Sequence, residues 1–198
     1  MKLLPTPLPG VLIVEPAVYA DERGWFMESF NEHRFNSAVQ ALGLPTPPRF
    51  VQDNHSCSSA GVLRGLHYQL PPHAQGKLVR VVQGAAFDVA VDITPGSPTF
   101  GLWFGLELSP INHRQLWIPP GFAHGFLALT DDTHFLYKTT DVYARDCERS
   151  IRYDDPAIAI RWPAIAGLLT PRVAPKDAAA SLLAQADLPP ASSASKRP

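Results

Sequence analysis

The sequence is built from short runs in which apolar and polar residues alternate, and most of these runs end at proline, glycine, asparagine or aspartate. In the clearest run, FDVAVDI at residues 87–93, every second side chain is large and apolar. A period of two directs neighbouring side chains to opposite faces of an extended chain, so this run predicts a β-strand. The PGSP sequence at residues 95–98 then predicts a turn. A chain made of such runs is restricted to architectures with many short strands.

About ten runs of this kind predict a β-sandwich or β-barrel. The 21 prolines support this interpretation, because proline is common between strands but disrupts helix interiors. The expected strands cover residues 11–15, 26–30, 50–56, 62–69, 78–83, 87–93, 100–108, 115–118, 124–129 and 134–141.

The sequence predicts short flanking helices in two segments. The first covers residues 32–42, and the second covers residues 178–186 with Asp177 as its expected N-cap. The terminal sequence LPPASSASKRP contains too little apolar surface to order itself. We therefore expect one domain over residues 1–186 and a disordered tail over residues 187–198, which is consistent with a total of 198 residues.

Charge and cysteine content argue against several classes of protein. The chain has 17 basic and 18 acidic residues, so no net field would attract nucleic acid or an anionic membrane. Cys57 and Cys147 form no CxxC pair, and we interpret both as buried or half-buried thiols. The sequence has neither a signal-peptide pattern nor an apolar run of about 20 residues, so we expect a cytoplasmic protein.

The segment GVLRGLH at residues 61–67 combines two polar side chains with an otherwise apolar strand. Arg64 and His67 are three residues apart, so a regular strand would direct them to opposite faces. Gly65 lies between them and permits a β-bulge, which would turn both toward one pocket. The alternative is a surface arginine and a half-buried histidine bonded to backbone.

A second segment, WIPPGFAHGF at residues 117–126, contains a P-x-G-x-x-H turn that ends at His124. This turn resembles the second motif of the cupins, whose fold is a double-stranded β-helix or jelly roll. The first cupin motif normally supplies an H-x-H pair to a metal ion. Here His67 is followed by Tyr68 and Gln69, so we expect neither a metal ion nor another cofactor.

Ten motifs in order, between about residues 11 and 183, resemble those of the dTDP-4-dehydrorhamnose 3,5-epimerase family. The motifs are DERGWFMESF, VQDNHS, GVLRGLH, QGKLVRVVQG, FDVAVDI, GSPTFG, RQLWIPPGFAHGF, FLYKTTDVY, the acidic Glu148 and APKDAAA. The resemblance implies an all-β, cupin-like fold and epimerisation at C3 and C5 of a dTDP-linked 4-keto-6-deoxyhexose in dTDP-L-rhamnose biosynthesis.

The resemblance also implies roles for four residues. His67 matches the base, and Asp177 matches the carboxylate that orients it. Tyr137 matches the acid on the opposite face of the sugar, and Lys77 matches the cation beside the C4 oxygen. By themselves, Asp177 could equally be a helix N-cap, Tyr137 a core aromatic and Lys77 a solvated surface charge.

Further positions match substrate-binding residues of the family. Arg64 and Arg23 match residues suited to the phosphates, and Tyr143 matches a second site tyrosine, expected on the same strand face as Tyr137. Arg23 and Glu28 belong to a segment at the family's dimer interface, so the resemblance implies a homodimer in which each site is completed by its neighbour. The remaining matched positions are Gln52, Asn54, His124, Glu148 and Lys176.

Three other interpretations remain open on the sequence. A relative with the same fold could epimerise only C3 or only C5, or could move the keto group between C4 and C3. A metal-dependent cupin enzyme would use a different chemistry and would need the missing H-x-H pair. A sugar-binding cupin without catalysis would bind the ligand but exchange no protons.

Overall fold

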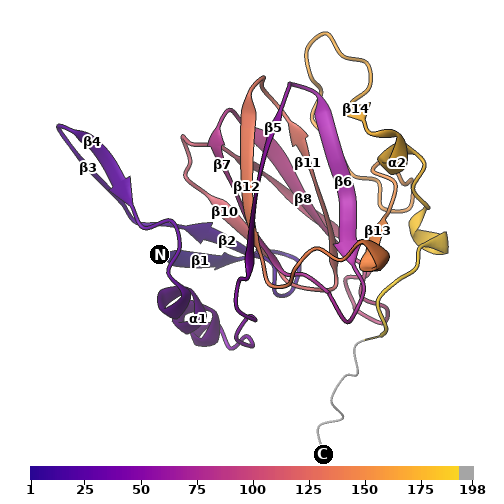
Figure 1. The fold of residues 1–198 in the computed structure, drawn as a ribbon, viewed down its shortest axis with the longest axis horizontal. Helices are drawn as coiled ribbons and strands as arrows, with labels where there is room; N and C mark the ends of the chain where they lie inside the picture. The colour runs from indigo at the N-terminus through magenta and orange to yellow at the C-terminus, as the bar shows by residue number, and fades with distance from the viewer. Residues whose placement is uncertain (192–198) are drawn as a thin grey trace, which may run out of the picture.

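The computed structural model describes residues 1–191, and its main body consists of two β-sheets that face each other (Figure 1). The first sheet has the order β1-β2-β10-β7-β12-β5, and the second has the order β13-β6-β11-β8-β9, with β14 parallel to β6. The first sheet contains β1 Lys2–Pro5, β2 Leu12–Glu15, β5 Gln52–Ser58, β7 Lys77–Gln83, β10 Gln115–Ile118 and β12 Thr133–Thr139. The second contains β6 Val62–Gln69, β8 Ala86–Asp92, β9 Trp103–Leu108, β11 Phe122–Ala128, β13 Glu148–Ser150 and β14 Arg172–Val173.

The two facing sheets form the cupin-like jelly roll that the sequence predicts. The expected strands at residues 62–69 and 115–118 match β6 and β10 in full, and the other runs in the body differ from the observed strands by a few residues. The strands β1, β13 and β14 were not expected. β13 and β14 have only three and two residues, which is too short to display a period of two, whereas β1 has four residues and includes Pro5.

A separate hairpin projects from the body, formed by β3 Val18–Asp21 and β4 Gly24–Met27 (Figure 1). The strand expected at residues 26–30 therefore begins earlier and ends before Ser29. Along this hairpin the side chains of Tyr19, Trp25 and Phe26 are exposed. Such a row of exposed aromatic residues is unusual for a surface that stays in contact with water.

The first expected helix is confirmed as α1 Glu32–Ala41, whose N-cap Asn31 accepts a hydrogen bond from the backbone N–H of Arg34 at 3.1 Å. Its buried residues Phe35 and Val39 cover the outer face of the first sheet. The second expected helix is wrong. The helix α2 is Pro175–Ala178, Asp177 lies inside it rather than at its N-cap, and only a 3₁₀ turn follows at Leu183–Gln185.

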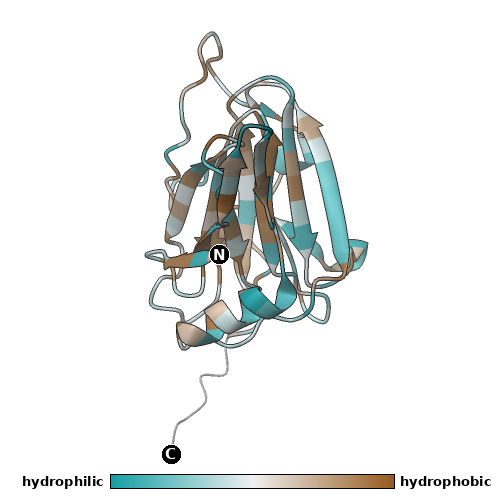
Figure 2. Cartoon of the chain, turned by 90° about the vertical axis from the view of Figure 1, so that its left-hand side faces the viewer, coloured by the Kyte–Doolittle hydropathy of each residue, from teal (hydrophilic) through white to brown (hydrophobic). Residues whose placement is uncertain are grey.

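The main core lies between the two sheets and is apolar at one end only. Phe126 and Phe135 stack at its centre, with ring centroids 4.0 Å apart. In the view of Figure 2, brown apolar residues predominate on the central strands of the body, and a long strand at the right edge is mostly teal. Beyond the stacked pair, polar side chains replace apolar ones between the sheets, and this change leaves room for a cavity.

The C-terminal segment and the two cysteines differ in part from what the sequence predicts. The expected tail falls mainly on residues 192–198, which lie outside the described residues, whereas the Asp187 carbonyl accepts a hydrogen bond from Tyr68 Oη at 2.7 Å. Both cysteines are free, but Cys57 is exposed, in contrast to the buried or half-buried position expected for it. Within residues 1–191, no helix combines the length and apolar character needed to span a bilayer.

Candidate active site

A cavity of about 360 Å³ opens between the two sheets, and nine of the thirteen predicted site residues line it. The first sheet contributes side chains from β5, β7 and β12, and the second contributes side chains from β6, β11 and β13. The short helix α2 closes one side. The nine residues are Asn54, Arg64, His67, Lys77, His124, Tyr137, Glu148, Lys176 and Asp177.

A bulge in β6, which Gly65 permits, brings Arg64 and His67 to the same cavity. In the pairing with β11, His67 lies opposite His124 and Arg64 lies opposite Phe126, so three steps on β6 match two on β11. Gly65 makes this possible, because its φ of +131° is a conformation that L side chains rarely adopt. A Cβ at Gly65 would also lie only 2.5 Å from a backbone Cα of β11.

His67 and Asp177 form a close pair at the cavity wall. His67 Nε2 lies 2.7 Å from Asp177 Oδ1, and the Asp177 side chain is only 2% exposed. The other carboxylate oxygen accepts the backbone N–H of Gly65 at 3.3 Å. An ionised carboxylate can only accept hydrogen bonds, so Nε2 of a neutral His67 carries the proton and Nδ1 keeps its lone pair. This is the arrangement of a general base held by a carboxylate.

The electrostatics of Asp177 favour its ionised form. Burial acts to raise the pKa of this carboxyl group, but the hydrogen bond and charge of His67, the Gly65 N–H and the Lys176 ammonium together lower it below its ordinary value. Asp177 therefore stays negative at neutral pH. A negative carboxylate stabilises the imidazolium that forms when His67 accepts a proton.

Tyr137 reaches the cavity from the opposite sheet. It lies on β12 of the first sheet, whereas His67 lies on β6 of the second. Burial raises the pKa of the Tyr137 phenol, although the nearby Arg64 guanidinium opposes this effect. The phenol therefore keeps its proton at neutral pH. A ligand between the sheets would have a base on one side and a proton donor on the other.

Lys77 is a buried cation on the floor of the cavity, not the solvated surface charge that a lone lysine would suggest. Its residue is 8% exposed, and Nζ donates a hydrogen bond to the backbone carbonyl of His67 at 3.3 Å. Burial lowers the pKa of Lys77 to about 8, while Asp88 and then Glu148 act in the opposite direction. Lys77 is therefore mostly protonated at pH 7 but loses its charge in mildly alkaline solution.

A second histidine and aspartate pair lies deeper between the sheets, and sequence reasoning identified only half of it. His124 Nε2 lies 2.7 Å from Asp88 Oδ1, and both residues are buried. Burial lowers the pKa of His124, and Asp88 opposes this effect. Asp88 was read as a polar position in an ordinary strand. One signal could have marked it. The face of this strand that carries Asp88 also carries Ala90 and Asp92, and an alanine between two acidic residues is not typical of a face that meets water.

At the mouth of the cavity, Tyr143 and Gln52 contact lining residues without lining it themselves. Tyr143 Oη donates to Glu148 at 3.1 Å, and Gln52 Nε2 donates to Asn54 Oδ1 at 3.0 Å. Gln52 Oε1 also accepts the Tyr143 backbone N–H at 3.0 Å. Because β12 ends at Thr139, Tyr143 belongs to the following loop and not, as expected, to the strand face of Tyr137.

Arg23 and Glu28 are not brought to the cavity of their own chain. The Arg23 side chain is 85% exposed and pairs with Asp21 at the tip of the projecting hairpin. Glu28 pairs with Arg34 at 3.2 Å and with Asn31. The structure therefore separates these two residues from the other predicted positions.

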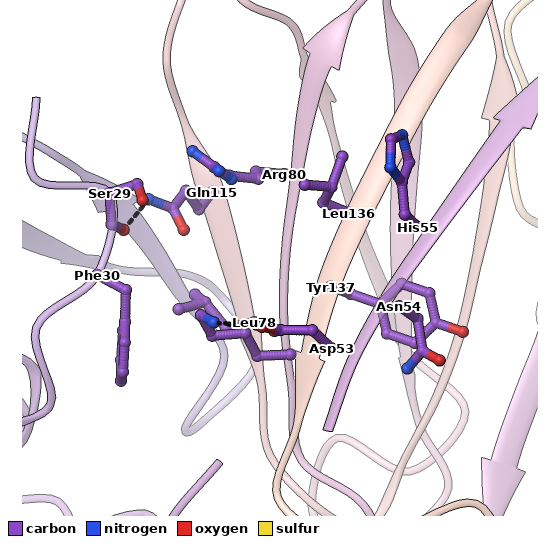
Figure 3. Close-up of a pocket in the computed structure, with 11 residues that line it drawn as sticks. Ser29, Phe30, Asp53, Asn54, His55, Leu78, Arg80, Gln115, Leu136 and Tyr137 are labelled. Carbon is purple, nitrogen blue, oxygen red and sulfur yellow. Dashed lines mark hydrogen bonds and ion pairs between the residues drawn. The ribbon is translucent and has the colours of Figure 1, made fainter. Parts of the chain in front are cut away.

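A second hollow, of about 220 Å³, lies against the outer face of the first sheet (Figure 3). It contains the cations Arg80 and Lys138, and Asp53 pairs with Lys138 at 2.9 Å. Figure 3 shows Tyr137 beside Asn54, away from Arg80. The His67–Asp177 pair lines the cavity between the sheets and not this hollow, so we assign the candidate active site to the inner cavity.

Among residues 1–191, no group of three or more histidine, cysteine, aspartate or glutamate side chains has an arrangement that could hold a metal ion. The chemistry open to the cavity from its own residues is proton transfer. The His67 imidazole can accept a proton, the Tyr137 phenol can donate one, and the Lys77 ammonium carries a positive charge.

Comparison with known proteins gives a consistent result. The family model described as dTDP-4-dehydrorhamnose 3,5-epimerase matches residues 5–185. A dTDP-4-dehydrorhamnose 3,5-epimerase of Shigella flexneri is 58% identical over 163 residues, which cover 82% of this chain and 87% of the relative. A more distant relative from Streptomyces niveus, described as a dTDP-4-dehydrorhamnose 3-epimerase, is 38% identical over 186 residues, or 94% of this chain and 86% of that protein.

A solved structure with the same fold comes from Legionella pneumophila. It is a dTDP-6-deoxy-D-glucose-3,5-epimerase in complex with dTDP-4-keto-L-rhamnose. The two chains are 50% identical, the match covers 96% of this chain and 97% of the other, and the TM-score is 0.86.

Proposed function

The chain belongs to the dTDP-4-dehydrorhamnose 3,5-epimerase family, and on this basis we propose that it inverts both C3 and C5 of dTDP-4-dehydro-6-deoxy-D-glucose. The product is dTDP-4-dehydro-L-rhamnose, an intermediate of dTDP-L-rhamnose biosynthesis. The observation that supports this most strongly is the pairing of His67 with Asp177 at 2.7 Å in a cavity that Tyr137 lines from the opposite sheet. Inversion requires a base and an acid on opposite faces of one carbon.

In the first step, His67 removes a proton from a carbon next to the C4 ketone. The electrons of the broken C–H bond form a double bond between that carbon and C4, and the pi electrons of the C4 carbonyl move to its oxygen, which becomes an enolate oxygen. The Lys77 ammonium stabilises the negative charge on that oxygen. Asp177 stabilises the imidazolium that forms at the same time.

In the second step, the enolate carbon takes the phenol proton of Tyr137 from the opposite face, and the carbonyl is formed again with inverted configuration at the carbon. The Tyr137 phenolate then recovers a proton from water, and His67 releases one. Atoms and charges balance, and one such cycle at each of C3 and C5 gives the product. No redox step is required.

The remaining residues bind the nucleotide sugar in this proposal. Arg64 holds the phosphates, since a guanidinium can donate two parallel hydrogen bonds to phosphate oxygens. The other proposed binding residues at or beside the cavity are Gln52, Asn54, His124, Tyr143, Glu148 and Lys176. The substrate-binding and catalytic residues all belong to one domain over residues 1–186.

We also propose that the protein is a homodimer in which the hairpin of one protomer completes the cavity of the other. Two observations support this arrangement: the hairpin projects from the body, and its aromatic side chains are exposed. The guanidinium of Arg23, at the tip of the hairpin, pairs with Asp21 but is otherwise exposed. It can therefore reach a ligand bound in another protomer. The Arg23 charge would then join Arg64 at the phosphates of a bound nucleotide.

A single-centre epimerase is the second candidate, because the Streptomyces niveus relative is described as a 3-epimerase. The relative with 58% identity is a 3,5-epimerase, so we favour inversion at both centres. The deciding experiment is proton NMR of dTDP-4-keto-6-deoxy-D-glucose incubated in deuterated water with chelator-treated protein.

We expect deuterium at both C3 and C5. Deuterium at one carbon would establish the single-centre reaction instead, and exchange that appears only after a metal ion is added would contradict the metal-free mechanism.

His67→Ala should abolish exchange at both carbons, whereas Tyr137→Phe should still permit removal of the proton but impair inverted reprotonation. His73 and Tyr153 are half-buried and lie outside the cavity, so they provide matched controls: His73→Ala and Tyr153→Phe should exchange like the wild type.

A further inference from the structure

Asp88 has an unusual position for an acidic residue. Its side chain is 0% exposed, and Oδ2 is buried with no hydrogen-bond partner within residues 1–191. A buried carboxylate oxygen without a partner destabilises the folded state, since it loses the hydrogen bonds of water. Such a group is retained where it has a role beyond packing.

The partner of the other carboxylate oxygen lies in the cavity wall. His124 on β11 points Nε2 at Asp88 Oδ1, 2.7 Å away, across the pairing of β11 with β8. Because the carboxylate accepts, Nε2 carries the proton and the ring is held in one orientation. Nδ1 is then the ring nitrogen left for a ligand in the cavity.

Asp88 also lies close enough to Lys77 to affect its charge. The Lys77 ammonium forms its hydrogen bond with the His67 carbonyl rather than with Asp88. Among the groups that oppose the loss of its proton, Asp88 contributes most and Glu148 contributes less. A charge between the sheets acts over a longer range than it would in water, because few water dipoles screen it.

We propose that Asp88 is a positioning residue of the epimerase: it orients His124 toward the sugar and keeps the Lys77 ammonium charged beside the enolate oxygen. This inference rests on the proposed function, because it assigns Asp88 to the same site and the same reaction. Asp88 does not line the cavity, so it acts only through His124 and Lys77.

The remaining charged and titratable groups around this cavity cannot substitute for Asp88. Glu148 lies at the mouth, where it is already bonded to Tyr143 and Lys176, and Asp177 is bonded to His67 and Gly65. Apart from Lys77 and His124, the other charged and titratable groups that face the cavity are His55, Arg64, His67, Tyr137 and Lys176, and none of these is a carboxylate.

The test is the variant Asp88→Asn, assayed as kcat and kcat/KM between pH 6 and pH 9. An asparagine has nearly the same shape and can still accept the His124 N–H, but it carries no charge. We expect kcat at pH 8 to fall roughly ten- to a hundredfold with little change in KM, which is a common effect of removing a residue that orients a site group. We also expect the alkaline limb of kcat/KM, which reports the free enzyme, to move to lower pH.

The sign of this shift follows from the charge on Lys77. Burial lowers the pKa of Lys77 to about 8, and the Asp88 carboxylate opposes this effect. Without that carboxylate, the pKa of Lys77 should therefore be lower than in the wild type. The variant should therefore be closest to the wild type at pH 6 and furthest from it at pH 8 or above. A residue that only supports the fold would reduce activity at all pH values alike.

Asp92 provides a matched control on the same strand. It too is buried, but its carboxylate accepts a hydrogen bond from Thr99 Oγ1 at 2.6 Å and from the Thr94 N–H at 2.9 Å, in a turn outside the cavity. Asp92→Asn should lower the thermal unfolding midpoint but leave the alkaline limb in place. If Asp88→Asn does not fold, Asp88→Ala tests the same shift, with a larger loss of kcat because His124 loses its acceptor as well.

An unchanged alkaline limb in the folded Asp88 variants would overturn the proposal, and so would an equal shift in Asp92→Asn. Failure of the proposed function is a separate outcome, since it would be seen as absence of deuterium exchange in the wild-type protein. The two conclusions are therefore decided by different samples.

Discussion

In the proposed mechanism, Asp177 is the residue that makes His67 a base, because its carboxylate lies 2.7 Å from the imidazole. At the scale of single residues, we predict that Asp177→Asn lowers kcat by a factor on the order of 10² to 10⁴, since the imidazolium of His67 would lose its counter-charge. Steady-state kinetics at pH 7 would measure this effect. Asp187→Asn is the control: Asp187 is 61% exposed and pairs with Arg149, so this variant should keep full activity. Equal losses in both variants would contradict the assignment.

The same residue makes stability depend on pH. The pKa of Asp177 is lowered in the folded protein, so its ionisation stabilises the fold above the pKa of an unfolded aspartate, about 4, and this contribution disappears as pH falls through the folded value. We predict that wild type exceeds Asp177→Asn in free energy of unfolding at pH 7 and that the difference shrinks below about pH 4. Urea unfolding at a series of pH values measures it. A difference that grows on acidification would show that the sign is wrong.

Residues differ in how far their sequence context reveals them. Gly65 permits a bulge between Arg64 and His67, with a surface arginine as the alternative, and the structure has the bulge and brings both side chains to the cavity. The contact expected between Asp177 and His67 is present, but the context of Asp177 alone suggests a helix N-cap, because this contact joins residues 110 positions apart. Asp88 was missed because a polar residue in an alternating strand ordinarily faces water, and only the packing of two sheets shows that it does not.

At the scale of elements, the bulge in β6 sets the direction of His67, and it depends on Gly65. We predict that Gly65→Ala destabilises the protein by about 2 kcal/mol or more and lowers kcat at least roughly tenfold, because the added methyl group pushes β6 away from β11. Gly96 is the control that separates the effect of backbone strain from the effect of the clash. Its φ is +82°, so an added side chain is strained, but nothing lies within 4 Å of an added Cβ. Gly96→Ala should cost about 1 kcal/mol and leave kcat unchanged.

Urea unfolding together with steady-state kinetics would compare the two variants. If Gly65→Ala kept wild-type kcat, the bulge would not be what positions His67.

The elements also differ in how predictable they are. The longer strands and α1 carry a complete pattern in their own residues, and the structure confirms them within a few positions. The helix α2 was placed too late, because the alanines and leucines after Asp177 favour helix intrinsically, whereas in the structure the next stretch bridges Ile151 through Ser181. The two-residue strand β14 exists only through its pairing with β6. Such elements depend on tertiary contacts that no local pattern encodes.

At the scale of the whole molecule, the separation of Arg23 from the cavity of its own chain leads to a test of the proposed dimer. His67→Ala removes the base of a cavity, and Arg23→Ala removes the hairpin cation that would enter the cavity of the partner. We predict that each variant alone is nearly inactive. When equal amounts are mixed and allowed to exchange subunits, half of the dimers become mixed, and one of the two sites in each mixed dimer is intact. Activity should return to about a quarter of the wild-type value.

The control for this mixing experiment uses two residues of one cavity. Mixing His67→Ala with Tyr137→Phe leaves a defect in every site, so activity should not rise above the sum of the separate variants. Light scattering of the unmixed proteins would establish that both variants are dimers before exchange. Recovery in the first mixture alone would mean that Arg23 acts across the interface, because an Arg23 that served the cavity of its own chain would leave one defect in every site. If neither mixture recovers activity, the hairpin serves its own chain or no site at all, and the composite site is wrong even if the protein is dimeric.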